Sequence, residues 1–240
     1  MTNYVLVFLI SMLAAILHNS ISFGYVILFM ALTPLFLPAR ICVMVSQVVG
    51  AILSLWIVVE LRKDVEMRKV WIPTLLSSIA VLAALRFSVG MADGFLMKCL
   101  GVLLLLLGIW MLLFAARVHI RPTAANGVIF GAVSGAMCAF FGVSAPPLVL
   151  YYSSVTEDKN HYNACLQMHL LLMGIVSIAG RIGFGLAAAE SWLYCIPAFA
   201  GAIAGRFPGR WLYGRLNERV FKMVIYIFIS VMGVYIFFTN

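Results

Sequence analysis

The chain has 240 residues, of which 65% are hydrophobic and only 10% are charged, and its formal net charge at pH 7 is +8. This apolar content lies far above the roughly 45–50% usual for soluble domains, which excludes a soluble globular protein and indicates an integral membrane protein. The basic residues are scattered through short segments between apolar runs, as is typical of Lys and Arg that orient membrane helices, which argues against a nucleic-acid-binding protein.

Eight apolar stretches follow one another along the chain, and the polar segments between them are short. A crossing of the bilayer needs roughly 20 apolar residues, and an apolar segment in lipid has to satisfy its own backbone hydrogen bonds. The sequence therefore predicts an all-α integral membrane protein made of one helical bundle, with no soluble domain. The stretches cover residues 4–37, 41–60, 70–88, 95–115, 127–151, 160–182, 192–205 and 220–238.

The first stretch contains the polar interruption HNSIS at residues 18–22. Its length of roughly 34 residues is too short for two full crossings. We expect it to form a hairpin that enters the membrane and returns, with HNSIS at its tip. The preceding MTNYVLVFLI lacks the basic region of a secretory signal, so this stretch is expected to be retained.

The fifth stretch, residues 127–151, contains a second interruption, GVSAPP, from Gly142 to Pro147. Pro has no amide hydrogen and clashes with the preceding helical turn, while Gly accepts backbone angles that other residues avoid. The connections 61–69 and 206–219 are strongly basic, and the positive-inside tendency puts both in the cytoplasm. They share a side only if 127–151 returns to the face from which it enters. This stretch is therefore predicted to be a re-entrant hairpin, and both termini are predicted to lie outside a bacterial-type inner (plasma) membrane.

The two halves of the chain also show signs of an internal repeat, as is common in transporters. A shift of 124 residues gives seven identities, although apolar segments can also align by chance. The identical pairs are Ile72 and Ile196, Pro73 and Pro197, Ile79 and Ile203, Ala80 and Ala204, Arg86 and Arg210, Gly90 and Gly214, and Lys98 and Lys222.

The charges of corresponding connections differ between the halves, since basic 61–69 aligns with near-neutral 183–191 and basic 206–219 aligns with a weakly acidic segment. Such a difference is expected when two repeats are inserted with opposite orientation. We predict two inverted repeats within one membrane domain, each a re-entrant broken-helix hairpin followed by three transmembrane helices. The first repeat is residues 1–116 and the second is residues 117–240.

The sequence GVIFGAVSGAMCAFFGVSAPPLVLYY, residues 127–152, resembles the second-repeat signature of the TauE/SafE (TSUP, sulfite/sulfonate exporter) family of membrane transporters. The resemblance extends over nearly the whole chain, through the hydrophobic profile, the dibasic connection after the second element and the Arg-rich connection before the last helix. Where the family has a glycine-rich first motif, this chain has HNSISFG, and Ser144-Ala145 stand where glycines are common. The resemblance implies transport of small sulfur-containing or organic anions, such as sulfite, thiosulfate or sulfonates.

Anion binding agrees with the chemistry of broken hairpins, because helix N-termini and unpaired amides carry partial positive charge near the midplane. We expect the anion where the hairpins meet, bound by tip amides and hydroxyls and lined by polar side chains. Small residues that pack helices closely, and hydrogen bonds between helices, are the alternative reading of the same residues. The candidate substrate-binding residues are Asn19, Ser20, Ser22, Ser46, Gln47, Ser134, Gly142, Ser144, Asn163 and Gln167.

Basic residues near the outer face need a reason, because an Arg at a helix centre costs roughly 2.5–3.5 kcal/mol. Arg40, Arg86 and Arg181 are predicted to form a positive vestibule that attracts anions, with snorkelling to the interface as the alternative. His18, at the first tip, is a candidate for proton coupling, with a structural hydrogen bond as the alternative.

Other function classes fit less well. Ser134 and His169 could form the dyad of an intramembrane serine hydrolase, but a helical wheel turns His169 away from the polar face of its helix. An anion channel is a further alternative. Cysteines lie in apolar runs without CxxC spacing, so we expect no metal and no cofactor. The expected partners are a small anionic substrate and the lipid bilayer, with a homodimer left open, and no enzymatic activity is expected.

Overall fold

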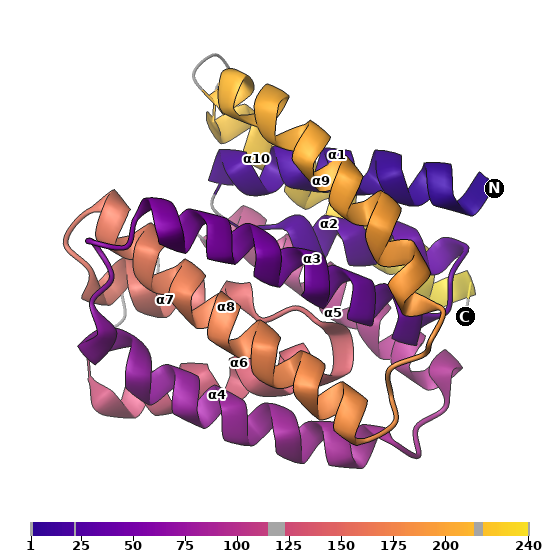
Figure 1. Ribbon diagram of the computed structural model, residues 1–240, viewed down its shortest axis with the longest axis horizontal. Coiled ribbons are helices and arrows are strands. Elements are labelled where there is room, and N and C mark those ends of the chain that lie inside the picture. The colour runs from indigo at the N-terminus through magenta and orange to yellow at the C-terminus, as the bar shows by residue number, and fades with distance from the viewer. Residues whose placement is uncertain (1, 22, 115–122, 214–217, 240) are drawn as a thin grey trace. The chain divides into compact units, whose positions relative to one another are not determined.

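The computed structural model describes residues 2–21, 23–114, 123–213 and 218–239, and these residues form helices and short connections without any strand (Figure 1). The predicted all-α fold is thus confirmed. In chain order the elements are α1 Thr2–Ile21, α2 Tyr25–Leu32, the 3₁₀ helix η1 Thr33–Leu35, α3 Ala39–Glu60, α4 Met67–Ser88, α5 Asp93–Phe114, α6 Ala124–Phe141, α7 Ala145–Val155, α8 Lys159–Gly183, α9 Ser191–Tyr213 and α10 Glu218–Thr239.

Several helices are long and apolar enough to cross a membrane, so the chain is a multi-pass membrane protein. In the described residues four segments meet both criteria: Thr2–Asn19, Ala39–Glu60, Met67–Ser88 and Lys159–Gly183. Shorter apolar helices occur at Tyr25–Leu35, Gly94–Trp110, Ala125–Phe141 and Ile227–Phe238.

Each stretch that was predicted to form a hairpin contains two helices with a break between them, and its re-entrant course in the membrane stays a prediction. The first break lies later than expected. α1 continues through His18 and Asn19 to Ile21, and the break comes just before Gly24, whose φ of 112° is left-handed. Polar side chains do not end the helix, because Asn19 Nδ2 donates back to Ala15 O at 2.7 Å. A glycine is needed where φ is positive, and this requirement sets the position of the break.

The basic segment 206–219 is also different from its prediction as a connection, because α9 extends through Pro208 to Tyr213. Arg206 is buried at 7% exposure, and Gly209 packs against Ile16 of α1. Burial against another helix keeps this segment helical in spite of its charge. Charge pattern alone does not reveal such packing.

The fold consists of two compact units, each of which takes helices from both halves of the chain. Unit 1 comprises residues 1–49, 91–117 and 188–240, and unit 2 comprises residues 50–90 and 118–187. The predicted boundary between repeats, at residue 116, lies outside the described residues, and the division into two repeats stays a prediction.

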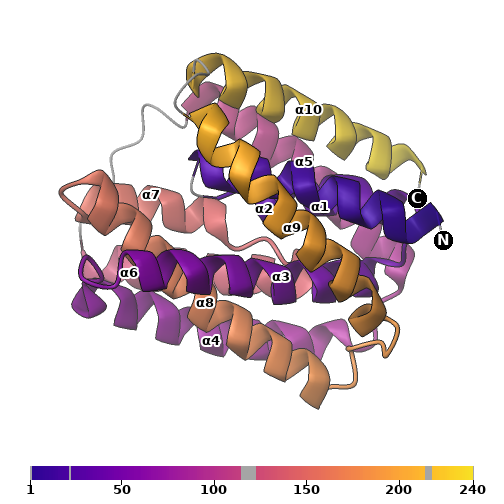
Figure 2. The ribbon, with the colours of Figure 1, turned by 45° about the horizontal axis from the view of Figure 1, so that its top comes forward.

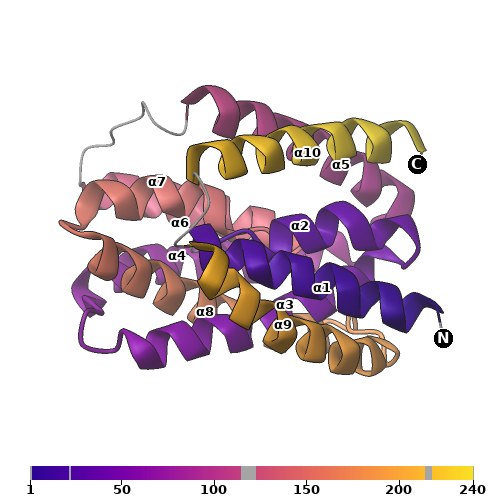
Figure 3. The same cartoon turned by 90° about the horizontal axis from the view of Figure 1, so that it is seen from above.

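Helix pairing within each unit follows the same rule. In unit 1, α1 packs along α9 (Figure 3) and α5 packs along α10 (Figure 2). In unit 2, α6 packs along α4, and α4 also contacts α8. The first helix of each half, α1 or α6, therefore packs against the fourth helix of the other half, α9 or α4. Two related halves would pair in this way, whereas their inverted orientation stays a prediction.

Glycines allow the backbones of these helix pairs to touch. A Cβ on Gly201 would lie 2.2 Å from Phe8 O in unit 1, and a Cβ on Gly135 would lie 2.3 Å from Ser77 O in unit 2. Small residues at such crossings let membrane helices gain packing contacts that lipid cannot offer. The small-residue face of α6, including Gly131 against Pro73 O, is thus used for close packing.

Candidate functional site

The break between α6 and α7 in unit 2 is fully buried. α6 ends at Phe141, and Gly142 closes it in a left-handed conformation with φ 74°, its N–H donating to Cys138 O at 2.9 Å. Ser144 is the residue before the first turn of α7, and it is 8% exposed. Glycine at this position ends a helix without a steric penalty, so a polar turn forms inside the apolar unit.

The start of α7 offers fewer backbone donors than a usual helix. Its second and third residues are Pro146 and Pro147, which carry no amide hydrogen. Ser144 and Ala145 supply the remaining N–H groups at this end, and the hydroxyl of Ser144 makes no capping hydrogen bond within the described residues. The predicted set of tip amides from Gly142 to Pro147 is therefore reduced to a few groups.

Ser134 holds the turn together from within α6. Its hydroxyl donates to Ser144 O at 2.9 Å, a bond between residues ten apart in the chain. The hydroxyl hydrogen of Ser134 is therefore engaged by the protein itself, and Ser134 fixes the carbonyl of the residue that begins α7.

Arg181, in the last turn of α8, is buried inside unit 2, and its part in an anion-attracting vestibule stays a prediction. It is 4% exposed, and its guanidinium donates from one terminal nitrogen to Cys138 O at 3.1 Å and to Ala139 O at 2.5 Å. These carbonyls belong to the last turn of α6, which carries partial negative charge. Arg181 therefore caps the helix that leads into the turn at Gly142.

The polar residues earlier on α8 join helices to one another. Ser54 of α3 donates to Gln167 Oε1 at 2.8 Å, and Gln167 Nε2 lies 3.4 Å from Asn163 Oδ1. Gln167 is completely buried. Hydrogen bonding between helices, the alternative considered for both residues, is thus present for Gln167, whereas the bond between Gln167 and Asn163 lies within α8.

His169 is the centre of a buried network in unit 2. Its Nδ1 lies 3.0 Å from Thr74 Oγ1 and 3.2 Å from the Tyr152 hydroxyl, and its Nε2 lies 3.2 Å from Ser77 Oγ. Ser77 uses its single hydrogen to donate to Gly131 O at 2.7 Å, so in the neutral ring Nε2 carries the hydrogen and Nδ1 accepts. Within the described residues, neither ring nitrogen of His169 has a hydrogen bond to Ser134. The serine-hydrolase alternative therefore gains no support.

In unit 1, the candidate residues near the first break have separate surroundings. Both ring nitrogens of His18 are buried and have no hydrogen-bond partner among the described residues. Ser46 donates to Val43 O of its own helix at 2.9 Å, Gln47 is buried, and Arg40 lies 3.3 Å from Met91 O. Ser22 and the side chain of Ser20 lie outside the described residues, and Asn19 is engaged with α1 as stated above. In unit 2, Arg86 is exposed near the end of α4.

Sequence reasoning overlooked the hydroxyls of α4 and gave no role to Ser177 of α8. Thr74 and Ser77 are three residues apart, and such a pair of hydroxyls on one face of an apolar helix is a signal that could have been used. Ser177 is completely buried, and its hydroxyl has no hydrogen-bond partner in the described part of the chain.

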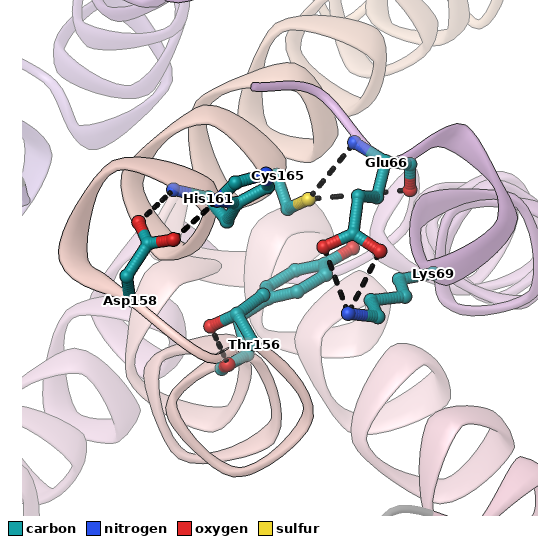
Figure 4. Close-up of polar contacts among 7 residues, drawn as sticks. Glu66, Lys69, Thr156, Asp158, His161 and Cys165 are labelled. Atoms are coloured by element: carbon teal, nitrogen blue, oxygen red, sulfur yellow. Dashed lines mark hydrogen bonds and ion pairs between the residues drawn. The ribbon is translucent and has the colours of Figure 1, made fainter.

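The connections that lead into α4 and α8 carry the charged contacts of unit 2 (Figure 4). Lys69 pairs with Glu66 at 2.8 Å, and the N–H of Glu66 donates to Cys165 Sγ at 3.4 Å. Asp158 caps α8 by accepting from the backbone N–H groups of Asn160 and His161. The His161 N–H, its ring and the Asn160 N–H hold the pKa of Asp158 below its ordinary value. The described residues contain no group of three His, Cys, Asp or Glu placed to hold a metal ion.

Comparison with protein families shows what the chain is similar to. Residues 7–236 match the family model described as Sulfite exporter TauE/SafE. This match includes both hairpins and confirms the resemblance recognised in residues 127–152. Searches of curated proteins and of solved structures gave no match.

Proposed function

The chain belongs to the sulfite exporter TauE/SafE family, a family of membrane transporters and not of enzymes, and from this premise we propose that it carries small sulfur-containing or organic anions. Sulfite, thiosulfate and sulfonates are the proposed substrate class. We place the substrate at the hairpin tips, where helix ends and hydroxyls supply positive partial charge within the membrane.

The observation that carries this proposal is the buried turn between α6 and α7. Residues 123–155 contain no Asp, Glu, Lys or Arg, so the local field comes from helix ends and from neighbours such as Arg181. The Ser144 hydroxyl makes no capping bond within the described residues, and it stands at the positive end of α7. A hydroxyl and an amide at a helix N-terminus are suited to a small anion.

The expected affinity is modest, as a carrier that must release its substrate requires. A hydrogen bond to a charged group contributes roughly 1.5–3 kcal/mol, and a helix terminus contributes about 0.3–2 kcal/mol. A dissociation constant of 1 mM corresponds to about 4 kcal/mol. Two hydrogen bonds and one helix terminus therefore support binding in the range of micromolar to millimolar.

His18 is our candidate for coupling to protons. It lies on a completely buried face of α1 together with Val7, Ser11 and Ala14, and its ring nitrogens lack partners among the described residues. Burial without a partner disfavours the charged ring, so His18 is proposed to take up a proton only when its surroundings open to water or to an anion.

The proposed topology follows from the distribution of charge. We propose two inverted repeats with re-entrant hairpins, both termini outside a bacterial-type inner membrane, and the connection at residues 61–69 in the cytoplasm. Accessibility of single cysteines placed at residues 65 and 213 to an impermeant thiol reagent tests this, because both sites are expected on the same side. Labelling from opposite sides would contradict the re-entrant hairpin.

Flux measurements in proteoliposomes test the transport function. We expect the purified chain to move radiolabelled sulfite or thiosulfate with saturable kinetics and to show counterflow, which a channel does not. Ser144→Ala should raise the KM about tenfold to 150-fold, because one hydrogen bond to a charged group is lost. Ser153→Ala is the matched control, since Ser153 is exposed and donates to Leu150 O of its own helix.

A further inference from the structure

Two buried polar groups on one face of α8 lack partners. They are the hydroxyl of Ser177 and the Nε–H of Arg181, and neither atom has a hydrogen-bond partner among the described residues. Residues four apart in a helix lie one above the other on the same face. Ser177 is completely buried and Arg181 is 4% exposed, so water does not satisfy either side chain at a surface.

Arg181 also lacks a counter-charge. Within the described residues its partners are carbonyl oxygens, those of Cys138 and Ala139, and no Asp or Glu. The end of α6 contributes only about half of a negative charge, while an uncompensated buried charge costs several kcal/mol. The residues that surround this guanidinium therefore do not neutralise its positive charge.

Apolar side chains account for much of the remaining surroundings. Cys138 and Ala139 belong to a buried cluster with Val81, Leu85 and Met173. A cation and a hydroxyl in such a place interact strongly with any anion that reaches them, because the low dielectric strengthens the attraction.

The position of Arg181 relates it to the turn between the hairpin arms. Its guanidinium contacts Cys138 and Ala139 in the last turn of α6, and Gly142 follows that turn directly. Ser144, whose hydroxyl makes no capping bond within the described chain, comes two residues later. The buried guanidinium of Arg181 therefore contacts the last turn of α6, next to the turn at which we propose that the substrate binds.

We propose that Arg181 and Ser177 bind the sulfo group of the transported anion directly. This inference rests on the proposed function and names the group that is recognised. The Nε–H of Arg181 and the hydroxyl of Ser177 donate to separate oxygens of one –SO₃ group, and the charge of Arg181 supplies the main attraction. Sulfite, thiosulfate and sulfonates share this group, whereas chloride has no oxygens to divide between two donors.

A purely structural role of Arg181 predicts that removal of the Ser177 hydroxyl leaves the response to substrate unchanged. If Arg181 only caps α6, its hydrogen bonds to the two carbonyls account for its burial, and Ser177 has no role in binding. Removing a buried hydroxyl that has no partner then leaves the protein equally stable or more stable, because a desolvation cost disappears. Ser177→Ala therefore separates binding from structure.

The first experiment measures thermal unfolding of the full chain in detergent, with sulfite, thiosulfate or a sulfonate added and with chloride at the same ionic strength as background. A ligand that binds only the folded state raises the melting temperature. We expect Ser177→Ala to melt at or above the parent without substrate and to lose most of the substrate-induced rise. The transport KM should increase about tenfold to 150-fold, as the loss of a hydrogen bond to a charged group implies.

Ser88→Ala is the matched control, because Ser88 is a buried hydroxyl of unit 2 that donates to Leu85 O of its own helix. It should keep the parent's response to substrate. Arg181→Lys retains the charge without the planar arrangement of donors, so weakened binding is expected, while Arg181→Gln removes the charge and should abolish binding.

The outcomes distinguish this inference from the function on which it rests. If the parent neither binds nor transports sulfite, thiosulfate or a sulfonate, the proposed function fails and the inference with it. If the parent responds but Ser177→Ala keeps the same substrate-induced rise and the same KM, the function stands and the binding role of Ser177 and Arg181 is overturned.

Discussion

The breaks of the two hairpins use glycine at opposite ends of the same turn. In unit 1, Gly24 stands directly before α2 with φ 112°, and in unit 2, Gly142 stands directly after α6 with φ 74°. The first turn of α2, Tyr25 to Ile27, keeps all its amide hydrogens, whereas α7 has two prolines in its first turn. The first break therefore offers backbone donors, and the second depends on side chains.

Different side chains join the two arms at each break. In unit 2, Ser134 donates to Ser144 O, and Arg181 donates to the last turn of α6. In unit 1, Ser11 lies 2.8 Å from the hydroxyl of Tyr25, the residue after Gly24, and donates to Ala198 O, which joins α1 to α2 and α9. The comparison teaches that one hairpin pattern is stabilised by different chemistry in the two units.

The largest expected effect concerns the helix pairs that both units share. Gly201→Ala in unit 1 and Gly135→Ala in unit 2 would each place a Cβ within 2.3 Å of a carbonyl oxygen, so the helices must separate. We expect each to destabilise its unit by about 3 kcal/mol, the upper part of the range for overpacking. Thermal unfolding measures this. Gly94→Ala is the control, because nothing lies within 4 Å of an added Cβ there, and equal effects at Gly94 would contradict the packing argument.

The next effect tests the buried network around His169 in unit 2. A shift of 123 residues aligns His169 with Ser46, and the Ser46 hydroxyl donates to Val43 O in its own helix. His169→Ser should cost about 2–3 kcal/mol, because it leaves a cavity and hydroxyls without their partner. Ser46→Ala should cost less than about 1 kcal/mol. Unfolding by denaturant gives both values, and a cost for His169→Ser no larger than that for Ser46→Ala would show that the network contributes little.

Features of the fold that depend on neighbouring residues could be predicted from the sequence, and features that depend on distant residues could not. Hydropathy and the Gly and Pro residues are local, so the helices and the break at Gly142 could be read directly from the sequence. Packing partners are not local: the pairing of α1 with α9, and the burial of Arg206 that extends α9, depend on residues nearly two hundred positions apart. The spacing of Ser177 and Arg181 places them on one face of a helix, but it does not show which carbonyls that face meets.

A smaller effect, on the KM for sulfite, is expected when a backbone amide hydrogen is restored at the second break, as α2 has at the first. Pro146→Ala restores an amide hydrogen in the first turn of α7, at the positive end of the helix. If tip amides bind the substrate, the KM for sulfite should fall about twofold to fivefold, the gain expected of about 0.5–1 kcal/mol from one hydrogen bond. Transport in proteoliposomes measures this. An unchanged or increased KM, with unchanged melting temperature, would indicate that the substrate is held by side chains alone.

The smallest effect concerns the start of the helix that follows each hairpin. In unit 2, α8 is capped by the carboxylate of Asp158, whereas in unit 1, α3 begins after Pro38, whose carbonyl accepts from the N–H of Cys42. The pKa of Asp158 is lowered in the folded chain, chiefly by the backbone N–H of His161. A lowered pKa means that the carboxylate stabilises the folded state fully above its unfolded pKa of about 3.9, and that this contribution is lost as the pH falls through the folded pKa.

Asp158→Asn should therefore flatten the dependence of the melting temperature on pH below about 4, while the amide oxygen of Asn keeps part of the cap. Pro38→Ala should shift the melting temperature by the same amount at every pH, because no charge at the start of α3 is altered. Thermal unfolding of both variants between pH 3 and pH 7 makes the comparison. If the melting temperature of Asp158→Asn changes with pH as that of the parent does, the charge of the Asp158 carboxylate does not stabilise the start of α8. The starts of α3 and α8 would then be energetically equivalent in this respect.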